Sequence, residues 1–152
     1  VNELLCQSNS EGLFITAFEG VLDLDTGDFV YVNAGHDAPF ICRKDGSYEQ
    51  LAVKPGFVLA GMEETKFTEG RITLYEGDKL FHYTDGVTEA TNTHNVLYGK
   101  ERLLLVLNKN KQQNPKETLS SVKADIDDFV GKAPQFDDIT MLCVEYRRNG
   151  EK

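Results

Sequence analysis

The first half of the sequence is a series of short apolar runs separated by turn residues, and this alternation limits the fold more than any other feature. Strand-like runs cover residues 14–24, 29–33, 38–43, 48–53, 66–75 and 79–84. Turn residues separate them at Asp25-Thr26-Gly27-Asp28, Lys44-Asp45-Gly46 and Glu76-Gly77-Asp78. Tandem hairpins of this kind predict an antiparallel sheet or sandwich. The run 14–24 is apolar on both faces, so we expect that strand to be covered on both sides.

The second half has the periodicity of helices. Residues 99–107 form a Leu-rich helical segment, and residues 115–130 place apolar side chains at helical spacing. Asn114-Pro115-Lys116-Glu117 is a capping signal before the second helix, and Gly131 ends it. The pattern also predicts a helix end at 1–9, a helical turn at 87–91 and a last strand at 139–146, which follows Pro134-Gln135-Phe136. Loops are expected at 54–61 and 91–96, and a polar tail at 147–152. The pattern predicts an α+β fold with no linker, so residues 1–152 are expected to form one domain.

Composition excludes several classes of function. With a net charge of −9, the chain is a poor partner for nucleic acid or an anionic membrane, both of which attract basic surfaces. No apolar run approaches the roughly 18 residues of a membrane span, and no signal peptide is visible. The cysteines are three and widely spaced, which favours reduced thiols and a cytoplasmic location. With the three histidines they give no closely spaced pair of zinc ligands.

The start of the sequence predicts a longer parent chain. Residues 1–5 have the character of the tail of a helix, with no capping residue ahead of them. We therefore expect the chain to be cut from something longer.

Acidic residues stand at the ends of two strands. Asp85 ends the apolar run of residues 79–84, and Asp137 and Asp138 precede the last strand. If these strands are antiparallel neighbours, the three carboxylates converge at one edge of the sheet. Converging carboxylates repel unless a cation lies between them, and Mg²⁺ or Mn²⁺ prefers such oxygen ligands. The same residues also fit ordinary solvated turns, in which aspartate is common.

Other polar and glycine positions have simpler interpretations. His36 in Asn33-Ala34-Gly35-His36 could be an acid, a base or a phosphate contact, but we interpret it as a strand-end histidine that holds a turn. His82 alternates with apolar strand residues and is interpreted as structural, and Cys143 as core. Gly56 and Gly61 could approach a phosphate, although loop geometry is sufficient to explain them.

Five blocks in order carry a resemblance to a known family. They are Phe14-Ile15-Thr16-Ala17-Phe18, Asn33-Ala34-Gly35-His36, Glu76-Gly77-Asp78-Lys79-Leu80, the stretch from Tyr83 to Ala90 with Tyr98-Gly99-Lys100-Glu101-Arg102-Leu103, and Asp137-Asp138-Ile139-Thr140-Met141-Leu142. The chain resembles the bacterial metal-dependent (PPM, type 2C-like) serine/threonine phosphatases of the stage II sporulation protein E and sigma-factor-regulator group. The resemblance implies an antiparallel β-sandwich flanked by helices. It also implies hydrolysis of phosphoserine or phosphothreonine by water bound between two Mn²⁺ or Mg²⁺ ions.

The resemblance assigns roles to particular residues. The late metal ligands of the family fall on Asp85 and Asp137, with Asp138 as a loop-holding residue or a second ligand. Gly86 would let the backbone turn behind the ligand, and Thr84 and Thr88 would support the ligands from behind. No catalytic residue separate from the metal site is implied. The implied partner is a phosphoprotein, and by resemblance a small one that switches an anti-sigma factor.

One motif of the family is missing from the sequence. The earlier metal motif, Gly-Asp-x-x-Gly-Lys/His-Gly, supplies a bridging aspartate, and Gly27-Asp28-Phe29 does not continue in that way. The chain therefore resembles a phosphatase domain without its N-terminal strands and first helix. We expect it to be inactive alone and to self-associate through an exposed sandwich face. A non-catalytic domain that binds a partner or transmits a signal, and a metal-binding β module without chemistry, are the alternatives.

Overall fold

The computed structural model describes residues 1–44, 46–54, 56–135 and 137–148. The turn residue Asp45, the loop residue Pro55, Phe136 before the last strand, and residues 149–152 of the polar tail lie outside the described residues. The chain divides into two compact units, which are described separately. The first contains residues 1–38 and 52–74 with Arg148, and the second contains residues 39–51 and 75–147.

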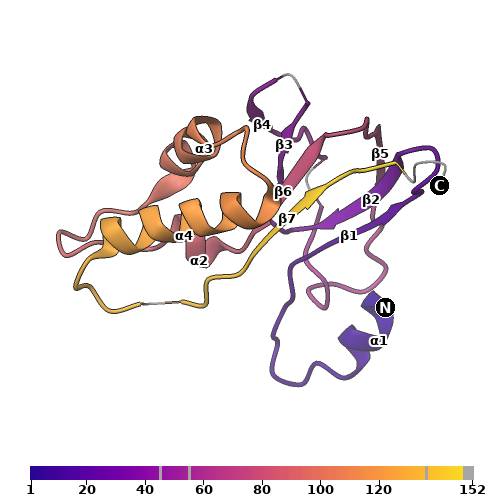
Figure 1. Cartoon of the computed structure of the whole chain (residues 1–152). Helices are drawn as coiled ribbons and strands as arrows, with labels where there is room; N and C mark the ends of the chain where they lie inside the picture. The colour runs from indigo at the N-terminus through magenta and orange to yellow at the C-terminus, as the bar shows by residue number, and fades with distance from the viewer. Residues whose placement is uncertain (45, 55, 136, 149–152) are drawn as a thin grey trace. The chain divides into compact units, whose positions relative to one another are not determined.

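The first unit is a three-stranded antiparallel sheet with one short helix (Figure 1). Its elements are α1 (Asn2–Gln7), β1 (Ala17–Leu22), β2 (Asp28–Ala34) and β5 (Glu69–Thr73), and the strand order is β1-β2-β5. The predicted hairpin of the first two strands is confirmed, with Leu22 opposite Phe29. The turn residues between the strands explain this success, because Asp23 Oδ1 accepts hydrogen bonds from the main-chain N–H groups of Asp25 and Thr26.

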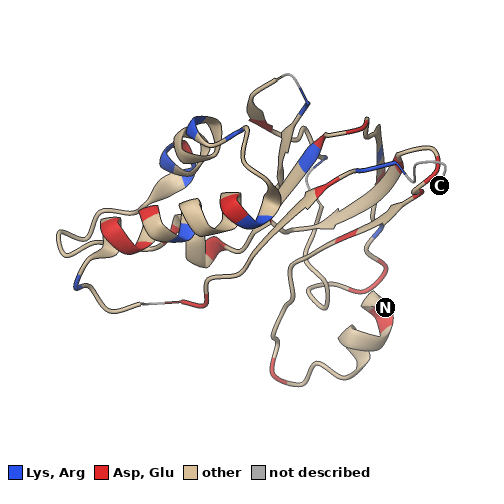
Figure 2. Ribbon diagram, viewed as in Figure 1, with Lys and Arg blue, Asp and Glu red and all other residues tan. Residues whose placement is uncertain are grey.

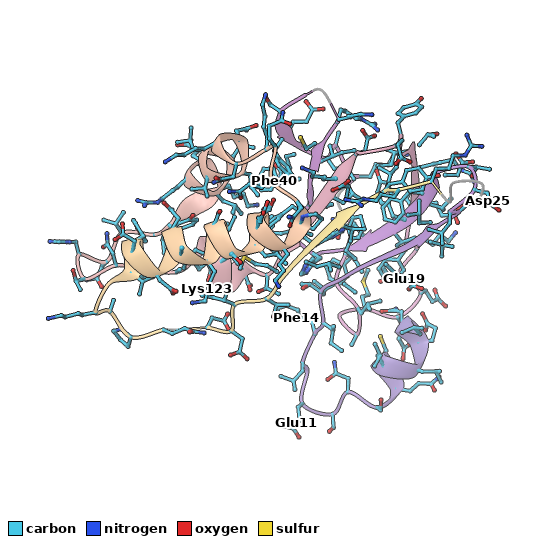
Figure 3. All side chains as sticks on the ribbon, viewed as in Figure 1. Glu11, Phe14, Glu19, Asp25, Phe40 and Lys123 are labelled. Atoms are coloured by element: carbon cyan, nitrogen blue, oxygen red, sulfur yellow. The ribbon has the colours of Figure 1, made fainter. Side chains whose placement is uncertain are left out.

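The expectation that the first strand is covered on both sides is wrong. β1 begins at Ala17, three residues later than predicted, and pairs with β2 alone because it is the edge strand of its sheet. Val21 is 70% exposed, and Phe14, labelled in Figure 3, lies exposed before the strand. An apolar pattern on both faces therefore did not predict burial of both faces in this strand.

The second unit is a four-stranded antiparallel sheet with three helices (Figure 1). Its strands are β3 (Phe40–Cys42), β4 (Tyr48–Gln50), β6 (Lys79–Tyr83) and β7 (Met141–Glu145), in the order β4-β3-β6-β7. β6 is therefore paired on both sides, and Tyr83 at its end lies opposite Met141 of β7.

The expected hairpin of the strands on either side of Glu76-Gly77-Asp78 is wrong. β5 pairs with β2, whereas β6 pairs with β3 and β7. The reason lies in Asp78, whose buried carboxylate accepts hydrogen bonds from the main-chain N–H groups of Lys44 and Tyr75. The bond from Lys44 attaches the turn to the residues that follow β3, and the bond from Tyr75 closes the turn itself.

Helices complete the second unit. They are α2 (Asp85–Thr88), α3 (Gly99–Lys109) and α4 (Pro115–Val130). The predicted capping box of α4 is present, since Asn114 Oδ1 accepts from Glu117 N and Glu117 Oε2 accepts from Asn114 N. α4 packs on α3 and β7, and the fully buried core consists of Phe81, Leu103, Leu107, Val122 and Ile126 with neighbours. The predicted α+β class with antiparallel sheets and flanking helices is confirmed.

The helices are all unsuited to a bilayer. Within the ranges that the structure describes, no helix combines the length and apolar character needed to cross a membrane.

Candidate metal centre

Asp85 occupies the junction between a strand and a helix. β6 ends at Tyr83, Thr84 is extended (φ −89°, ψ 160°), and α2 begins at Asp85 itself. The helical turn thus starts two residues earlier than the sequence predicted. The Asp85 carboxylate is exposed, and its Oδ1 accepts a hydrogen bond of 3.0 Å from Gly86 N. The main-chain N–H groups in the first turn of α2 favour a carboxylate at this position.

The loop before β7 meets this junction. β6 and β7 are antiparallel neighbours, so the end of β6 lies beside the start of β7. Thr84 N donates to the carbonyl of Thr140 at 3.1 Å, and the Thr84 hydroxyl donates to the carbonyl of Asp138 at 3.1 Å. Thr140 N in turn donates to Thr84 Oγ1 at 3.1 Å. The three bonds hold the Asp138 main chain against the residue that precedes Asp85.

Gly86 allows the two segments to approach closely. It is buried, and a Cβ atom at this position would overlap the carbonyl oxygen of Asp138 and lie 3.0 Å from its carbon. Its φ is not among the positive values of the chain, so the predicted tight turn does not by itself require a glycine. Glycine is required here because a backbone carbonyl fills the space that a side chain would take.

The remaining site residues hold the main chain. The side-chain hydrogen bond within the loop comes from Asp137, whose Oδ1 accepts from Asp138 N at 2.7 Å. Asp138 holds the loop through its carbonyl instead. The Thr88 hydroxyl is buried and donates to the Asp85 carbonyl at 3.2 Å. Thr84 and Thr88 therefore hold the main chain of Asp138 and Asp85 in place by hydrogen bonds.

The donors fit a hard divalent cation in type but not in number. Asp85, Asp137 and Asp138 offer exposed carboxylate oxygens at one sheet edge, which Mn²⁺ and Mg²⁺ prefer and to which water has access. In the part of the chain that the structure describes, however, no group of three or more His, Cys, Asp or Glu side chains could hold a metal ion. The described residues of the junction are thus too few to hold a metal ion by themselves.

His36, Cys42 and Cys143 make contacts of their own. In the first unit, Asn33 Oδ1 accepts from His36 N and Asn33 Nδ2 donates to the His36 carbonyl, both at 2.9 Å, while Thr16 Oγ1 lies 3.0 Å from His36 Nδ1. His36 is therefore part of a hydrogen-bonded turn. Cys42 and Cys143 are buried in the second unit, and burial raises the pKa of both thiols, as expected for core residues.

Sequence reasoning missed a polar network between α3 and α4. Arg102 donates from Nε and Nη2 to the two oxygens of Asp125 at 2.8 and 3.1 Å, and the Tyr98 hydroxyl donates to Asp125 Oδ2 at 2.8 Å. The Arg102 hydrogen bonds hold the pKa of Asp125 below its usual range, and burial raises the pKa of Tyr98. The spacing of Tyr98 and Arg102 on one helix face was the available signal, but nothing in the sequence identified Asp125 as their partner.

A pocket beside Asp137 was also missed. It has a volume of about 50 Å³ and is lined by Gly86 and the residues that follow α2, by the last turns of α4, and by Pro134, Gln135, Asp137 and Ile139. Its walls come from the residues at and after α2 on one side and from α4 and the loop that follows it on the other, which are far apart in sequence, so no local pattern predicts the pocket.

Comparisons with known proteins agree with this architecture. The family model described as "Stage II sporulation protein E (SpoIIE)" matches residues 1–147. The chain is 34% identical over 132 residues to Protein IcfG of Synechocystis, covering 87% of this chain and 20% of that protein. It is 30% identical over 98 residues to phosphoserine phosphatase RsbU of Bacillus subtilis, covering 64% of this chain and 29% of that protein. The chain therefore spans less than a third of these curated relatives.

Solved structures share the fold. The PP2C phosphatase domain of SpoIIE from Bacillus subtilis, with a fragment of its regulatory domain, gives a TM-score of 0.78 at 19% identity, covering 98% of this chain and 43% of that one. The RsbU and RsbW domains of Rv1364c from Mycobacterium tuberculosis give 0.72 at 22% identity, covering 99% and 43%. The catalytic domain of the serine/threonine protein phosphatase PstP, solved with two manganese ions, gives 0.63 at 15% identity, covering 93% and 65%. The predicted type 2C phosphatase-like fold class is confirmed.

Proposed function

The chain belongs to the stage II sporulation protein E family, and from this premise we propose that residues 1–152 are a single, incomplete phosphatase domain whose parent hydrolyses phosphoserine or phosphothreonine in a regulatory phosphoprotein. The observation that carries the proposal is the meeting of Asp85 with the Asp137–Asp138 loop at one sheet edge. Such an edge accommodates a hard cation and leaves room for a phosphate and water.

Each residue of the junction has a role in this proposal. Asp85 and Asp137 would hold Mn²⁺ or Mg²⁺, and Asp138 is a candidate for a further ligand. When bound, the metal ions supply a nucleophilic water and offset the charge of the phosphoryl oxygens. Thr84 and Thr88 fix the backbone through the hydrogen bonds to Asp138 and Asp85, and Gly86 keeps the two segments in contact.

The parent protein is proposed to need a further aspartate from outside this chain. Two ions require more ligands than the described residues bring together at the edge. This chain alone is therefore expected to bind Mn²⁺ weakly and to show little activity toward p-nitrophenyl phosphate. Equal activity of this chain and of the full-length protein would contradict the expectation.

The substrate and location are part of the same proposal. One relative is a phosphoserine phosphatase, and the resemblance is to regulators of sigma factors. We therefore infer that the substrate is a small cytoplasmic phosphoprotein that switches an anti-sigma factor. We further propose that the chain alone self-associates, because β1 is an edge strand and Val21 is exposed. A monomer in light scattering would contradict self-association.

A Mn²⁺ titration of the full-length protein tests the site. Asp85→Asn keeps the shape of the side chain but removes its charge, so the Mn²⁺ affinity measured by calorimetry should fall about tenfold or more, together with the hydrolysis rate. Asp128→Asn is the matched control, because Asp128 is an exposed carboxylate of α4 outside the junction. Equal effects of the two substitutions would refute the assignment.

One observation is equally consistent with a second function. The absence of a three-ligand group from the described residues is also what a non-catalytic domain for partner binding or signal transmission would show. The sequence upstream of Val1 separates the two, because a Gly-Asp-x-x-Gly-Lys/His-Gly motif there favours the enzyme and its loss favours the binding domain.

A further inference from the structure

The pocket beside Asp137 has apolar walls. Ile126 and Val130 of α4 form one wall, and Ala90 after α2, Pro134 and Ile139 form the others. Its volume of about 50 Å³ is room for about four water-sized groups, since one such group needs roughly 10–15 Å³. A hollow of this size and lining accommodates a short aliphatic chain rather than a bulky ring.

The polar part of the pocket is acidic. Glu89, Asp127 and Asp137 contribute to its lining, and Figure 2 shows acidic residues on both α2 and α4. The Asp127 carboxylate already has a cationic partner, because both of its oxygens accept hydrogen bonds from Lys123 Nζ. Asp137 belongs to the proposed metal site. Lys123 is labelled on α4 in Figure 3. Glu89 is exposed and is the carboxylate left to receive a ligand.

The pocket adjoins the proposed reaction site. Gly86 and Asp137 line it, and Gly86 follows Asp85 directly. A residue that flanks a phosphoserine held at Asp85 and Asp137 would lie close enough to enter it. A lysine or arginine suits both parts of the pocket, because its aliphatic stem can lie against the apolar walls while its charged end meets the carboxylate.

We propose that this pocket is a specificity subsite that binds a lysine or arginine side chain of the phosphoprotein substrate next to the phosphorylated residue. The proposal rests on the proposed phosphatase function. The net charge of −9 adds a long-range attraction for such a substrate. A substrate glutamate at the same position is disfavoured, because it would place a like charge beside Glu89.

Phosphoserine peptides test the subsite with the Mn²⁺-loaded full-length protein. Each flanking position is occupied in turn by arginine, norleucine or glutamate, and kcat/KM is measured. At one flanking position, kcat/KM for the arginine peptide should exceed that for the norleucine peptide about two- to fivefold and that for the glutamate peptide about tenfold. This is the range expected when one exposed charge contact is added or reversed. Glu89→Gln should bring the arginine-to-norleucine ratio close to one. Asp128→Asn, an exposed charge of α4 outside the pocket, should leave the ratio unchanged.

A second variant and a second readout do not depend on Glu89. Val130→Met places a longer aliphatic side chain at the pocket wall, so it should lower kcat/KM for the arginine and norleucine peptides but not for an alanine peptide, with folding checked by thermal melting. Methyl NMR of Ile126, Val130 and Ile139 follows binding of a non-hydrolysable phosphonate peptide, and the arginine form should shift these methyl signals. The readout needs no turnover.

The outcomes separate the two proposals. Hydrolysis without a preference at any position, and without methyl shifts, overturns the subsite and leaves the phosphatase function intact. Methyl shifts that depend on arginine and on Glu89, without hydrolysis of any peptide, overturn the phosphatase function and support the pocket. Absence of both hydrolysis and shifts overturns both.

Discussion

The buried carboxylate of Asp78 allows the sharpest test of how the second unit is held together. Asp78 is 1% exposed at the start of β6. Its oxygens accept from Arg43 Nη1 at 2.6 Å, from Lys44 N at 3.0 Å and from Tyr75 N at 2.9 Å. Asp78→Asn keeps the volume of the side chain but removes its charge. The NH₂ group of the asparagine would then face at least one of these N–H donors, and two donors form no hydrogen bond with each other.

The expected loss follows from these contacts. Each main-chain N–H bond to the carboxylate contributes about 1 kcal/mol net. The Arg43 pair adds about 1 kcal/mol, because the arginine side chain is 42% exposed and water screens it. Asp78→Asn should therefore lower the free energy of unfolding by about 3 kcal/mol, and Asp78→Ala by at least as much. A loss of that size is a large part of the roughly 5–15 kcal/mol that stabilises a typical domain.

Urea denaturation followed by circular dichroism measures the loss. The midpoint should fall in both Asp78 variants while the slope stays constant, which marks a change of stability rather than of the compactness of either state. Asp127→Asn is the control, because the Asp127–Lys123 pair is exposed on both sides and contributes at most about 0.5 kcal/mol. If Asp78→Asn lost no more than that control, the carboxylate would not hold the turn, and the account of the β5–β6 connection would be wrong.

Three further predictions follow from the second unit. Asp125→Asn should lower the free energy of unfolding by about 1 kcal/mol at neutral pH. Because Arg102 lowers the folded-state pKa of Asp125, this difference between the variant and the unchanged protein should be complete above about pH 4 and should vanish as the pH falls through the lowered pKa. Urea denaturation at a series of pH values measures the difference. Gly86→Ala should lower the free energy of unfolding by about 1–3 kcal/mol and weaken Mn²⁺ binding by the full-length protein, because the added Cβ overlaps the Asp138 carbonyl. An unchanged Mn²⁺ affinity in calorimetry would contradict the close approach of Gly86 to Asp138. Asn114→Ala should lower the free energy of unfolding by about 1 kcal/mol in thermal melts, while a threonine at the same position recovers most of it.

The elements that the sequence predicted well depend on local signals. The hairpin of β1 and β2 is determined by the turn residues between its strands, and α4 by a capping box and a terminal glycine, all within a few residues of the element they define. The neighbouring positions of Asp85 and Asp137 could be inferred as well, although only on the condition that β6 and β7 pair. That condition is the part of the site that a resemblance or a structure has to supply.

The failures share a physical cause, since each depends on residues distant in sequence. The pairing of β5 with β2 rather than with β6 depends on Asp78, whose partners include Lys44 in another turn. The requirement for glycine at position 86 comes from a carbonyl 52 residues away, at Asp138, and no pattern around Gly86 contains that information. The pocket beside Asp137 likewise needs two segments that are far apart in sequence.

The framework of the candidate metal centre is complete within one unit even though its ligands are few. Asp85 and the Asp137–Asp138 loop both belong to the second unit, and three hydrogen bonds of 3.1 Å through Thr84 join them. Separating the two carboxylate-bearing segments would break all three bonds and open the buried contact at Gly86. The end of β6 is paired with β7, where Tyr83 lies opposite Met141, and the residues before it, up to Phe81, are paired with β3 as well. What limits metal binding by the described residues is therefore the number of oxygen donors that they bring together, because the hydrogen bonds through Thr84 hold the two segments side by side.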